Sequence, residues 1–332
     1  MLGVDSGGSG VRVALARGDG SAVAAPAACA RPAVTGGRGI DADSLLGLVL
    51  PLARGLMAAA GAGRIDAACV GAAGMATLGA DLRARLPQAL DEALGVRELA
   101  LAGDVVTAYA GALGLRPGAV VAAGTGMIAL GTSGPGDGWR RADGWGHLLG
   151  DAGGGAWIGR EGLDAAMRAH DGRAGGSPAL LERLRERFGP PEGLPGQLYP
   201  RQDRPAVLAS FAPDVAACAT ADPVAADILG RAAGHIVEAA AAVLPRKAPA
   251  AGEPVEVALA GGLFRTGEPL LAPLRARAAA VLPGARLRLA DGDPLDGAVR
   301  IASALWRGAL TLPADPALLS VVHRPDRPDD HG

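Results

Sequence analysis

Short apolar runs alternate along the chain with longer segments in which apolar residues recur at helical spacing. Within residues 1–30 the pattern predicts three short strands, with a turn at Asp19-Gly20 before the third. The remainder of the first half is expected to form helices over 44–60, 80–94 and 105–113 and strands over 67–73 and 98–102. Asp43 or Ser44 is expected to cap the first of these helices.

The second half opens at the Arg116-Pro117-Gly118 turn with a strand pair of its own and a Gly/Trp-rich segment over 134–156. A largely helical region follows, with breaks at Gly/Pro clusters around 172–178 and 189–205. The last expected elements are a strand over 255–260, a helix over 269–281, a strand over 286–289 and a helix over 294–306. Strands that alternate with helices in this way imply a mixed sheet covered on both faces.

The length of 332 residues is sufficient for two domains, and we expect both to be α/β. The N-terminal domain is expected over 1–115, and the C-terminal domain, with its helical insertion, over 116–308. The last helix, 294–308, is a candidate to pack back on the N-terminal domain. Residues 309–332 are rich in Pro, Asp and Arg and are expected to form a flexible tail.

One pattern occurs twice, over residues 2–15 and 120–130: an apolar run, a glycine turn with a hydroxyl residue, and a second apolar run. Such a turn exposes backbone N–H groups with no Cβ nearby, which suits a phosphate group. Glycine hairpins are common and mostly structural, but two in the two halves of a chain suggest a duplicated fold that grips a polyphosphate. The turn residues are Gly7, Gly8 and Ser9 in the first and Gly124, Thr125 and Gly126 in the second.

Composition excludes several classes of function. Aromatic residues are only 3% of the chain and the net charge is −2, which argues against a nucleic-acid partner. No apolar run approaches the roughly 20 residues that span a bilayer, and the start of the chain lacks a secretion signal. We therefore expect a cytoplasmic protein without a membrane partner, although only Met1 and Leu2 precede Gly3, which leaves room for a start upstream.

The chain has three cysteines and one lysine. Cys29, Cys69 and Cys218 have no paired spacing for zinc or an iron–sulfur cluster, and we interpret them as reduced core thiols. Lys247 lies in a Pro-Arg-Lys-Ala-Pro segment that is typical of a loop. A Walker-type phosphate loop needs a lysine directly after its last glycine, so bound ATP would have to be held by the two glycine turns instead.

Two aspartates follow predicted strands. Asp5 comes just before the first turn, where a carboxylate could hold Mg²⁺ beside bound phosphates, or could form an ordinary Asx turn. Asp104 ends a strand and starts a helix, the position at which open α/β sheets bind ligands. Phosphoryl transfer to an alcohol needs a carboxylate that accepts the hydroxyl proton; helix capping would explain the same residue.

The segment 144–155 is the densest cluster of glycine and polar residues in the chain. A Trp145 flanked by glycines offers a flat apolar face and Asp151 offers two hydrogen-bond acceptors, which together suit a sugar ring. The alternative is a flexible loop, although loops seldom carry tryptophan. His147 has no spaced partner and favours packing or hydrogen bonding over metal binding.

Gly261 and Gly262 follow a predicted strand and would let a flat ring such as adenine approach the backbone, although a strand-to-helix turn often needs glycine for itself. We assign no chemistry to the Asp291-Gly292-Asp293-Pro294 turn, which leads into a helix that starts with proline.

Together these motifs resemble the actin-like ATPase superfamily, whose fold is ribonuclease H-like. Within it the chain resembles the BadF/BadG/BcrA/BcrD ATPase family, and its N-acetylglucosamine kinase and glucosamine kinase members in particular. The resemblance runs to about residue 308. The segments that carry it are 4–9, 103–104, 124–126, 144–151, which is the most specific, and 260–264.

The resemblance implies that ATP and Mg²⁺ bind in a cleft between two domains, with Asp5 at the metal and Gly261 and Gly262 at adenosine. Asp104 would be the base on a primary hydroxyl of an amino sugar, and Trp145, Gly146 and Asp151 would lie near the sugar. Dimers are common in this family, so a homodimer is compatible with the resemblance.

The chain departs from the family's usual motifs at several positions. Ser6 and Ser9 replace a glycine and a threonine of the first motif, which is a mild change. Met127 stands where the family often has a serine, and 34–37 lacks the asparagine with which amino-sugar kinases contact their substrate. These departures bear on which sugar is used.

Two alternative functions remain open: an ATPase that activates a radical dehydratase or reductase, and a non-catalytic sugar or nucleotide sensor. The first would need cluster-binding cysteines, which Cys29, Cys69 and Cys218 do not match. Retention of both Asp5 and Asp104 argues against the second.

Overall fold

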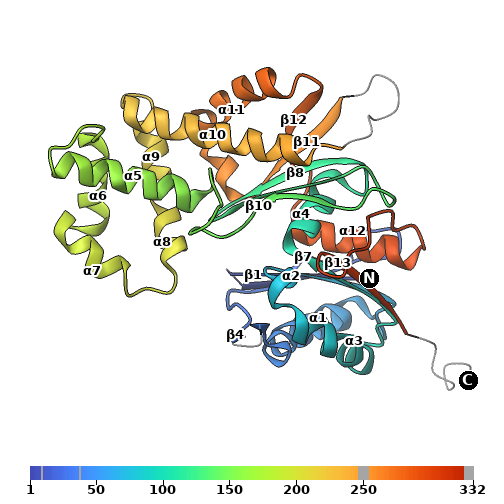
Figure 1. The fold of residues 1–332 in the computed structure, drawn as a ribbon. Helices are drawn as coiled ribbons and strands as arrows, with labels where there is room; N and C mark the ends of the chain where they lie inside the picture. The colour runs from blue at the N-terminus through green and yellow to red at the C-terminus, as the bar shows by residue number, and fades with distance from the viewer. Residues whose placement is uncertain (9, 37–38, 246–253, 325–332) are drawn as a thin grey trace, which may run out of the picture. The chain divides into compact units, whose positions relative to one another are not determined.

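The chain folds around two β-sheets flanked by helices, as the sequence predicts (Figure 1). The computed structural model describes residues 1–8, 10–36, 39–245 and 254–324. The chain divides into two compact units that are not continuous in sequence. Unit 1 comprises Met1–Pro117, Thr132–Trp139 and Ala290–Gly332; unit 2 comprises Gly118–Gly131 and Arg140–Leu289.

The sheet of unit 1 has the strand order β13-β7-β6-β1-β2-β3. Neighbours β1, β6 and β7 are parallel, whereas β2, β3 and β13 run antiparallel to their partners. Every residue of the central strand β6 is buried, as its uninterrupted apolar sequence predicts. The bounds are β1 Leu2–Gly7, β2 Gly10–Leu15, β3 Ala27–Cys29, β6 Ala67–Ala72, β7 Glu98–Gly103 and β13 Leu319–His323.

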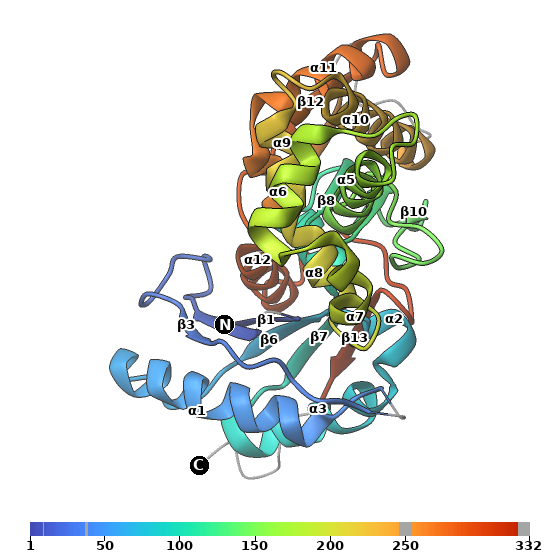
Figure 2. The same ribbon diagram turned by 90° about the vertical axis from the view of Figure 1, so that its left-hand side faces the viewer.

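Helices cover both faces of this sheet: α1 and α3 lie on one face, and α4 and α12 on the other (Figures 1 and 2). The bounds are α1 Ala42–Ala60, α2 Met75–Leu78, α3 Ala80–Leu94, α4 Asp104–Leu113 and α12 Pro294–Trp306, with a small β4–β5 pair at Thr35–Gly36 and Gly39–Ile40.

The helices α4 and α12 pack unusually close to each other because glycines line their contact. A Cβ on Gly297 would lie 1.8 Å from the Thr107 carbonyl oxygen, and one on Gly111 would lie 2.0 Å from that of Asp293. Neither position can therefore take a larger residue without moving a helix.

The N-terminus of α1 differs in detail from the prediction. Asp41, and not Asp43 or Ser44, is the N-cap, and its Oδ1 accepts a hydrogen bond from the Ser44 N–H at 2.7 Å. Among the described residues α1 is also the one helix that is long and apolar enough to cross a membrane by length and composition. Its buried residues, such as Leu45 and Val49, belong to the core of unit 1, and core helices pass the same test.

The sheet of unit 2 has the order β10-β9-β8-β11-β12. β11 runs parallel to both of its neighbours, β8 and β12, whereas β10 runs antiparallel to β9. The helices α10 and α11 pack together beside this sheet, and α5 to α9 extend beyond its end (Figure 1). The strand bounds are β8 Gly118–Ala123, β9 Met127–Thr132, β10 Arg140–Asp143, β11 Val255–Ala260 and β12 Ala285–Leu289. The helix bounds are α5 Gly155–His170, α6 Pro178–Phe188, η1 Pro191–Gly193, α7 Leu194–Leu198, α8 Arg204–Ser210, α9 Ala212–Cys218, α10 Pro223–Val243, η2 Gly262–Thr266 and α11 Glu268–Val281.

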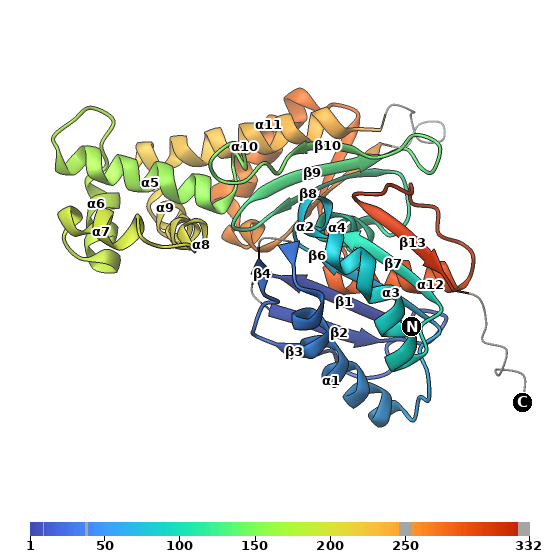
Figure 3. The ribbon, with the colours of Figure 1, turned by 60° about the horizontal axis from the view of Figure 1, so that its bottom comes forward.

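The C-terminal part of the chain differs from the expected division. Residues 319–323 were expected in a flexible tail, but they form β13, which pairs with β7 at the edge of the unit 1 sheet (Figure 3). Just beyond this strand, Arg324 forms an ion pair with the buried Asp91, with 3.2 Å between Nε and Oδ2. α12 belongs to unit 1, where it packs on β1 and β6, as was considered for the last helix. Of the expected tail 309–332, residues 325–332 lie outside the described residues.

Candidate functional site

Asp5 lies on β1 directly opposite Arg12 of β2. The Arg12 guanidinium donates from Nε at 3.1 Å and from Nη2 at 2.6 Å, and both bonds end on Asp5 Oδ2. Nη1 of the same guanidinium bonds Asp293 Oδ2 at 2.5 Å. Asp293 also caps α12, where its Oδ1 accepts from the N–H groups of Leu295 and Asp296. Arg12 therefore fixes the position of Asp5, and Arg12 is itself fixed by its bond to Asp293, the N-cap of α12.

The first turn, which joins β1 to β2, leaves open space next to its glycines. A Cβ on Gly7 or Gly8 would meet nothing within 4 Å. Gly10 is different, because its φ is +135° and a Cβ there would lie 2.2 Å from the Cys29 carbonyl oxygen, so this position requires glycine. The predicted phosphate ligand Ser9 lies outside the described residues.

Asp104 is the first residue of α4 and the one exposed residue of that helix. The N-cap is Gly103, so the capping role that the sequence offered as an alternative does not apply. Asp104 Oδ1 accepts a hydrogen bond from the Val105 N–H at 2.9 Å, and its carbonyl accepts one from Thr107 Oγ1 at 2.9 Å. The carboxylate thus stands at the carboxyl end of β7, on a helix that is otherwise buried.

The second turn, residues 124–126, is fixed by the start of α5. The N–H groups of Gly155 and Ala156 donate to the carbonyls of Gly124 and Thr125 at 2.9 and 2.8 Å. A Cβ on Gly155 would lie 2.6 Å from the Gly124 carbonyl oxygen, so glycine is needed for this contact. The glycine run at 153–155 therefore serves close packing and is not a flexible loop, whereas a Cβ on Gly124 itself would meet nothing within 4 Å.

Residues 144–152 form a defined loop, here called the Trp145 loop. The Gly146 carbonyl accepts the N–H groups of Leu149 and Gly150 at 3.1 and 2.8 Å, which closes a turn inside the loop. The Gly146 N–H donates to Asp151 Oδ1 at 3.1 Å. Trp145 is 64% exposed, and the Arg141 guanidinium lies 4.4 Å from the centre of its ring. A cation therefore covers part of the ring while most of the side chain remains exposed.

Asp151 connects the Trp145 loop to the second turn. A Cβ on Gly126 would lie only 2.3 Å from Asp151 Oδ2, so the carboxylate packs directly against the backbone of the turn. Burial raises the pKa of Asp151, and the neighbouring Asp143 adds to this effect. The backbone N–H of Met127 faces this carboxylate and acts to lower its pKa. The predicted phosphate motif and the predicted sugar motif of unit 2 thus meet at this side chain.

Met127 does not present its side chain to this site. It is 2% exposed and belongs to the hydrophobic core of unit 2, and only its backbone faces Asp151. A serine side chain at this position would also point into the core, so having methionine here costs the surface near Asp151 no hydroxyl group.

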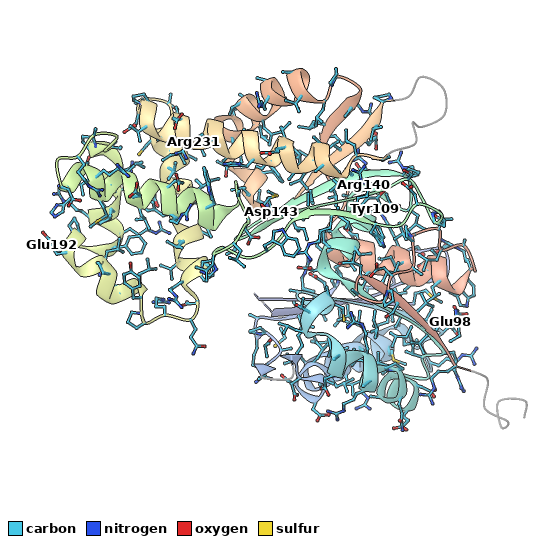
Figure 4. All side chains as sticks on the ribbon, in the orientation of Figure 1. Glu98, Tyr109, Arg140, Asp143, Glu192 and Arg231 are labelled. Atoms are coloured by element: carbon cyan, nitrogen blue, oxygen red, sulfur yellow. The ribbon has the colours of Figure 1, made fainter. Side chains whose placement is uncertain are left out.

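Sequence reasoning missed Asp143, the last residue of β10 (Figure 4). Its Oδ1 accepts the Asp151 N–H at 2.6 Å and its Oδ2 accepts the Ala152 N–H at 3.0 Å. Asp143 and Asp151 are the two non-glycine residues with positive φ in the described chain, at 60° and 57°. No sequence motif marks this residue, because the partners of its carboxylate are backbone groups.

Gly261 and Gly262 play different roles. Gly261 has a φ of +102°, and a Cβ there would lie 2.2 Å from the Ala123 carbonyl oxygen, so this glycine is required by the contact with β8. A Cβ on Gly262 would meet nothing within 4 Å, and both residues are exposed. The side of Gly262 on which a Cβ would stand is therefore open.

Each unit contains residues of the kinds that bind phosphate, and unit 1 also contains a carboxylate suited to a divalent cation. No group of three or more His, Cys, Asp or Glu side chains gathers as a metal site in this part of the chain. Mg²⁺ in phosphate sites is commonly bound by one or two carboxylates together with water and phosphate oxygens, and Asp5 supplies one whose Oδ1 takes no bond from Arg12. Gly7, Gly8 and Gly124 each leave open space beside the backbone, and a Cβ at any of these positions would reduce the space available to a phosphate group.

Comparison with known proteins relates the chain to an ATPase family and to sugar kinases. A family model described as the BadF/BadG/BcrA/BcrD ATPase family matches residues 2–275. A curated N-acetylmuramic acid/N-acetylglucosamine kinase of Clostridium acetobutylicum is 36% identical over 85 residues. The match covers 26% of this chain and 27% of that protein, so it spans about a quarter of the relative's length.

Two solved structures are similar over most of the chain. A Chromobacterium violaceum protein, provisionally assigned as an N-acetylglucosamine kinase, is 30% identical with a TM-score of 0.67, and the match covers 90% of this chain and 96% of that one. A ROK family glucokinase of Streptomyces griseus, solved with glucose and AMPPNP, is 17% identical with a TM-score of 0.55, covering 93% and 99%. The second likeness concerns the fold alone.

Proposed function

The chain belongs to the BadF/BadG/BcrA/BcrD ATPase family, and on that premise we propose that it transfers the terminal phosphoryl group of ATP to a primary hydroxyl of an amino sugar. N-acetylglucosamine and glucosamine are the substrate types that the named relatives suggest. The observation that carries the proposal is the contact of Asp151 with both Gly126 and the Trp145 loop. A sugar bound at this carboxylate would lie next to a phosphate bound at the second turn.

The roles of the individual residues follow from their chemistry. Asp104 is the base: its carboxylate accepts the proton of the sugar hydroxyl, whose oxygen attacks the terminal phosphorus as the bond to the bridging oxygen breaks and ADP leaves. Asp151 accepts hydrogen bonds from sugar hydroxyls, and the exposed side of Trp145 packs against the C–H face of the ring.

The nucleotide has its own set of residues. The backbone N–H groups near Gly7, Gly8, Ser9 and Gly124–Gly126 would surround the phosphates, and adenine would lie beside Gly262. Asp5 would hold Mg²⁺ directly or through water, and the ion, when bound, neutralises charge that develops on the phosphate oxygens.

The alternative of a dehydratase or reductase activator gains no support from the cysteines. Cys69 is completely buried on β6, and burial raises the pKa of its thiol far above the ordinary value. Burial also raises the pKa of Cys218. Cys69, enclosed in the sheet of unit 1, therefore presents no exposed thiol to a cluster.

The proposal is tested by ADP release in a coupled assay over a panel of hexoses and amino sugars, with Asp104→Asn as the control variant. We expect an amino sugar to stimulate turnover and Asp104→Asn to lower kcat by about 10²- to 10⁴-fold, the usual effect of losing a general base. Turnover that no sugar stimulates would contradict the kinase proposal. An Asp104→Asn variant with wild-type kcat would contradict the assigned base alone.

A further inference from the structure

We infer that Asp143 is a positioning residue for the sugar: its carboxylate fixes the backbone of Asp151 and thereby the place from which the Asp151 carboxylate meets the substrate. The inference rests on the proposed function, because it assumes that Asp151 binds the sugar. It assigns to Asp143 a role that neither its position in sequence nor any motif indicates.

Both carboxylate oxygens of Asp143 accept hydrogen bonds from the C-terminal end of the Trp145 loop. Oδ1 accepts the Asp151 N–H at 2.6 Å and Oδ2 accepts the Ala152 N–H at 3.0 Å. Hydrogen bonds to an ionised acceptor are about twice as strong as neutral ones. The loop therefore starts and ends at the same side chain, with Asp143 immediately before residue 144 and bonded to residues 151 and 152.

The anchor itself is fixed to the sheet. Asp143 is paired with Ile128 in the β10–β9 register, two residues beyond the second turn. A Cβ on Gly144 would lie 2.6 Å from Ile128 Cδ1, so the chain leaves the strand in close contact with that side chain. A Cβ on Gly150 would lie 2.2 Å from Asp143 Oδ1, which shows how tightly the returning chain covers the carboxylate.

The loop conformation has an energetic cost that these bonds offset. Asp143 and Asp151 both adopt left-handed backbone conformations, with φ of 60° and 57°. Such a conformation costs a non-glycine residue of the order of 1 kcal/mol or more and persists where the surroundings determine it. The two hydrogen bonds to Asp143 stabilise the left-handed backbone of Asp151. The hydrogen bond from the Gly146 N–H to Asp151 Oδ1 then links this fixed position to the residue beside Trp145.

The left-handed backbone of Asp143 can be kept in variants that alter only its carboxylate. Glycine and asparagine both tolerate positive φ, so Asp143→Gly removes both acceptors without adding strain, and Asp143→Asn retains one acceptor. Asp137 provides the matched control, because its carboxylate accepts from Ser133 Oγ, at 2.7 Å, within the preceding loop. Asp137→Gly should therefore leave the kinetics unchanged.

Steady-state kinetics with the best sugar of the panel test the inference, with KM for the sugar and KM for ATP measured separately. Because the loss of a hydrogen bond to a charged group weakens binding by about 10- to 150-fold, we expect Asp143→Gly to raise KM for the sugar by about 10- to 100-fold and Asp143→Asn by less. KM for ATP should stay within about 2-fold, because Gly124 and Thr125 are held by α5 and not by Asp143.

Hydrogen exchange followed by mass spectrometry gives a readout that needs no turnover. The N–H groups of residues 144–152 should exchange faster in Asp143→Gly, while those of α10 should keep wild-type rates. If Asp143→Gly does not fold, Asp143→Asn carries both measurements.

Two results would overturn the inference: a wild-type KM for the sugar in Asp143→Gly, or an equal rise in both KM values with faster exchange throughout unit 2. A wild-type protein that no sugar stimulates overturns the proposed function, and the sugar-binding role of Asp151 with it. The first two results leave the kinase proposal standing, so the two failures are distinguishable.

Discussion

A single methyl group at Gly126 should separate sugar binding from nucleotide binding. Gly126 has no positive φ, so its backbone accepts alanine. The new Cβ would lie 2.3 Å from Asp151 Oδ2 and 3.0 Å from Asp151 Cγ. Non-bonded heavy atoms settle at roughly 3.5 Å, so the carboxylate has to move by about 1 Å.

That displacement sets the expected size of the effect. A shift of about 1 Å at a reacting centre costs about 10²-fold in rate, and the loss of one hydrogen bond to a charged group costs about 1.5–3 kcal/mol, or about 10- to 150-fold. The two estimates agree. We expect Gly126→Ala to lower kcat/KM for the sugar by about 100-fold and to change KM for ATP little.

Gly124→Ala is the matched control within the same turn. Its Cβ would meet nothing within 4 Å in the protein itself, but it would narrow the space in which we propose that phosphate binds. KM for ATP should therefore rise while KM for the sugar stays near wild type. The two alanine variants thus have opposite signatures in the coupled assay.

A double-mutant cycle closes the argument. If the methyl group acts through Asp151, then Gly126→Ala should have little further effect in an Asp151→Asn background, because the group that it displaces is already impaired. Wild-type sugar kinetics in Gly126→Ala, or full additivity with Asp151→Asn, would refute the reasoning. Thermal unfolding of each variant checks that the fold is retained.

Two further predictions concern the charged groups. Arg12→Met should lower the free energy of unfolding by about 1–2 kcal/mol in urea titrations, because Asp5, with a side chain only 17% exposed, loses both donors, and solvent around the 39%-exposed Arg12 keeps the loss small. Asp293→Asn leaves the Arg12 bonds to Asp5 in place, so a loss as large as that of Arg12→Met would contradict this account. Burial, with the charge of Asp143, raises the pKa of Asp151, so kcat/KM for the sugar should fall in acid at a pH above the ordinary Asp value of about 3.9. In our proposal the charged form of Asp151 accepts the sugar hydroxyls, and an acid limb at or below that value in a pH–rate profile would count against this role.

Elements with a strong local signal were predicted from the sequence with few errors. The helices at 80–94 and 294–306 and the strand at 255–260 have the predicted bounds. For the helix at 294–306 the reason is visible: Pro294 starts it, and Asp293 and Asp296 form a capping box. Such signals lie within a few residues of each other, so sequence alone can reveal them.

The strands β10 and β13 were missed for different reasons. β10, with the sequence Arg-Arg-Ala-Asp, has no apolar alternation and is a strand because it pairs with β9. β13 has the sequence Leu-Ser-Val-Val-His, which favours a strand, but the Pro- and Asp-rich residues around it led to the expectation of a tail. For β10 the free energy comes from contacts across the sheet, which local propensity does not report.

The candidate site shows the same division. Asp104 and Asp151 were identified because each ends a recognisable motif, and their roles remain predictions until the variants are measured. Asp143 and Arg12 were passed over because their partners, two backbone N–H groups and two separate carboxylates, lie elsewhere in the chain. Side chains that hold a functional group in place have no spacing rule that a sequence could display.

The return of α12 and β13 to unit 1 has a consequence for synthesis on the ribosome. Domains generally fold as units while the chain emerges N-terminus first. Until all of unit 2 has been translated, the sheet face under α12 therefore stays uncovered and the outer edge of β7 stays unpaired. During that interval the exposed edge invites misassembly, and nascent chains stalled before residue 290 should be the species that chaperones bind.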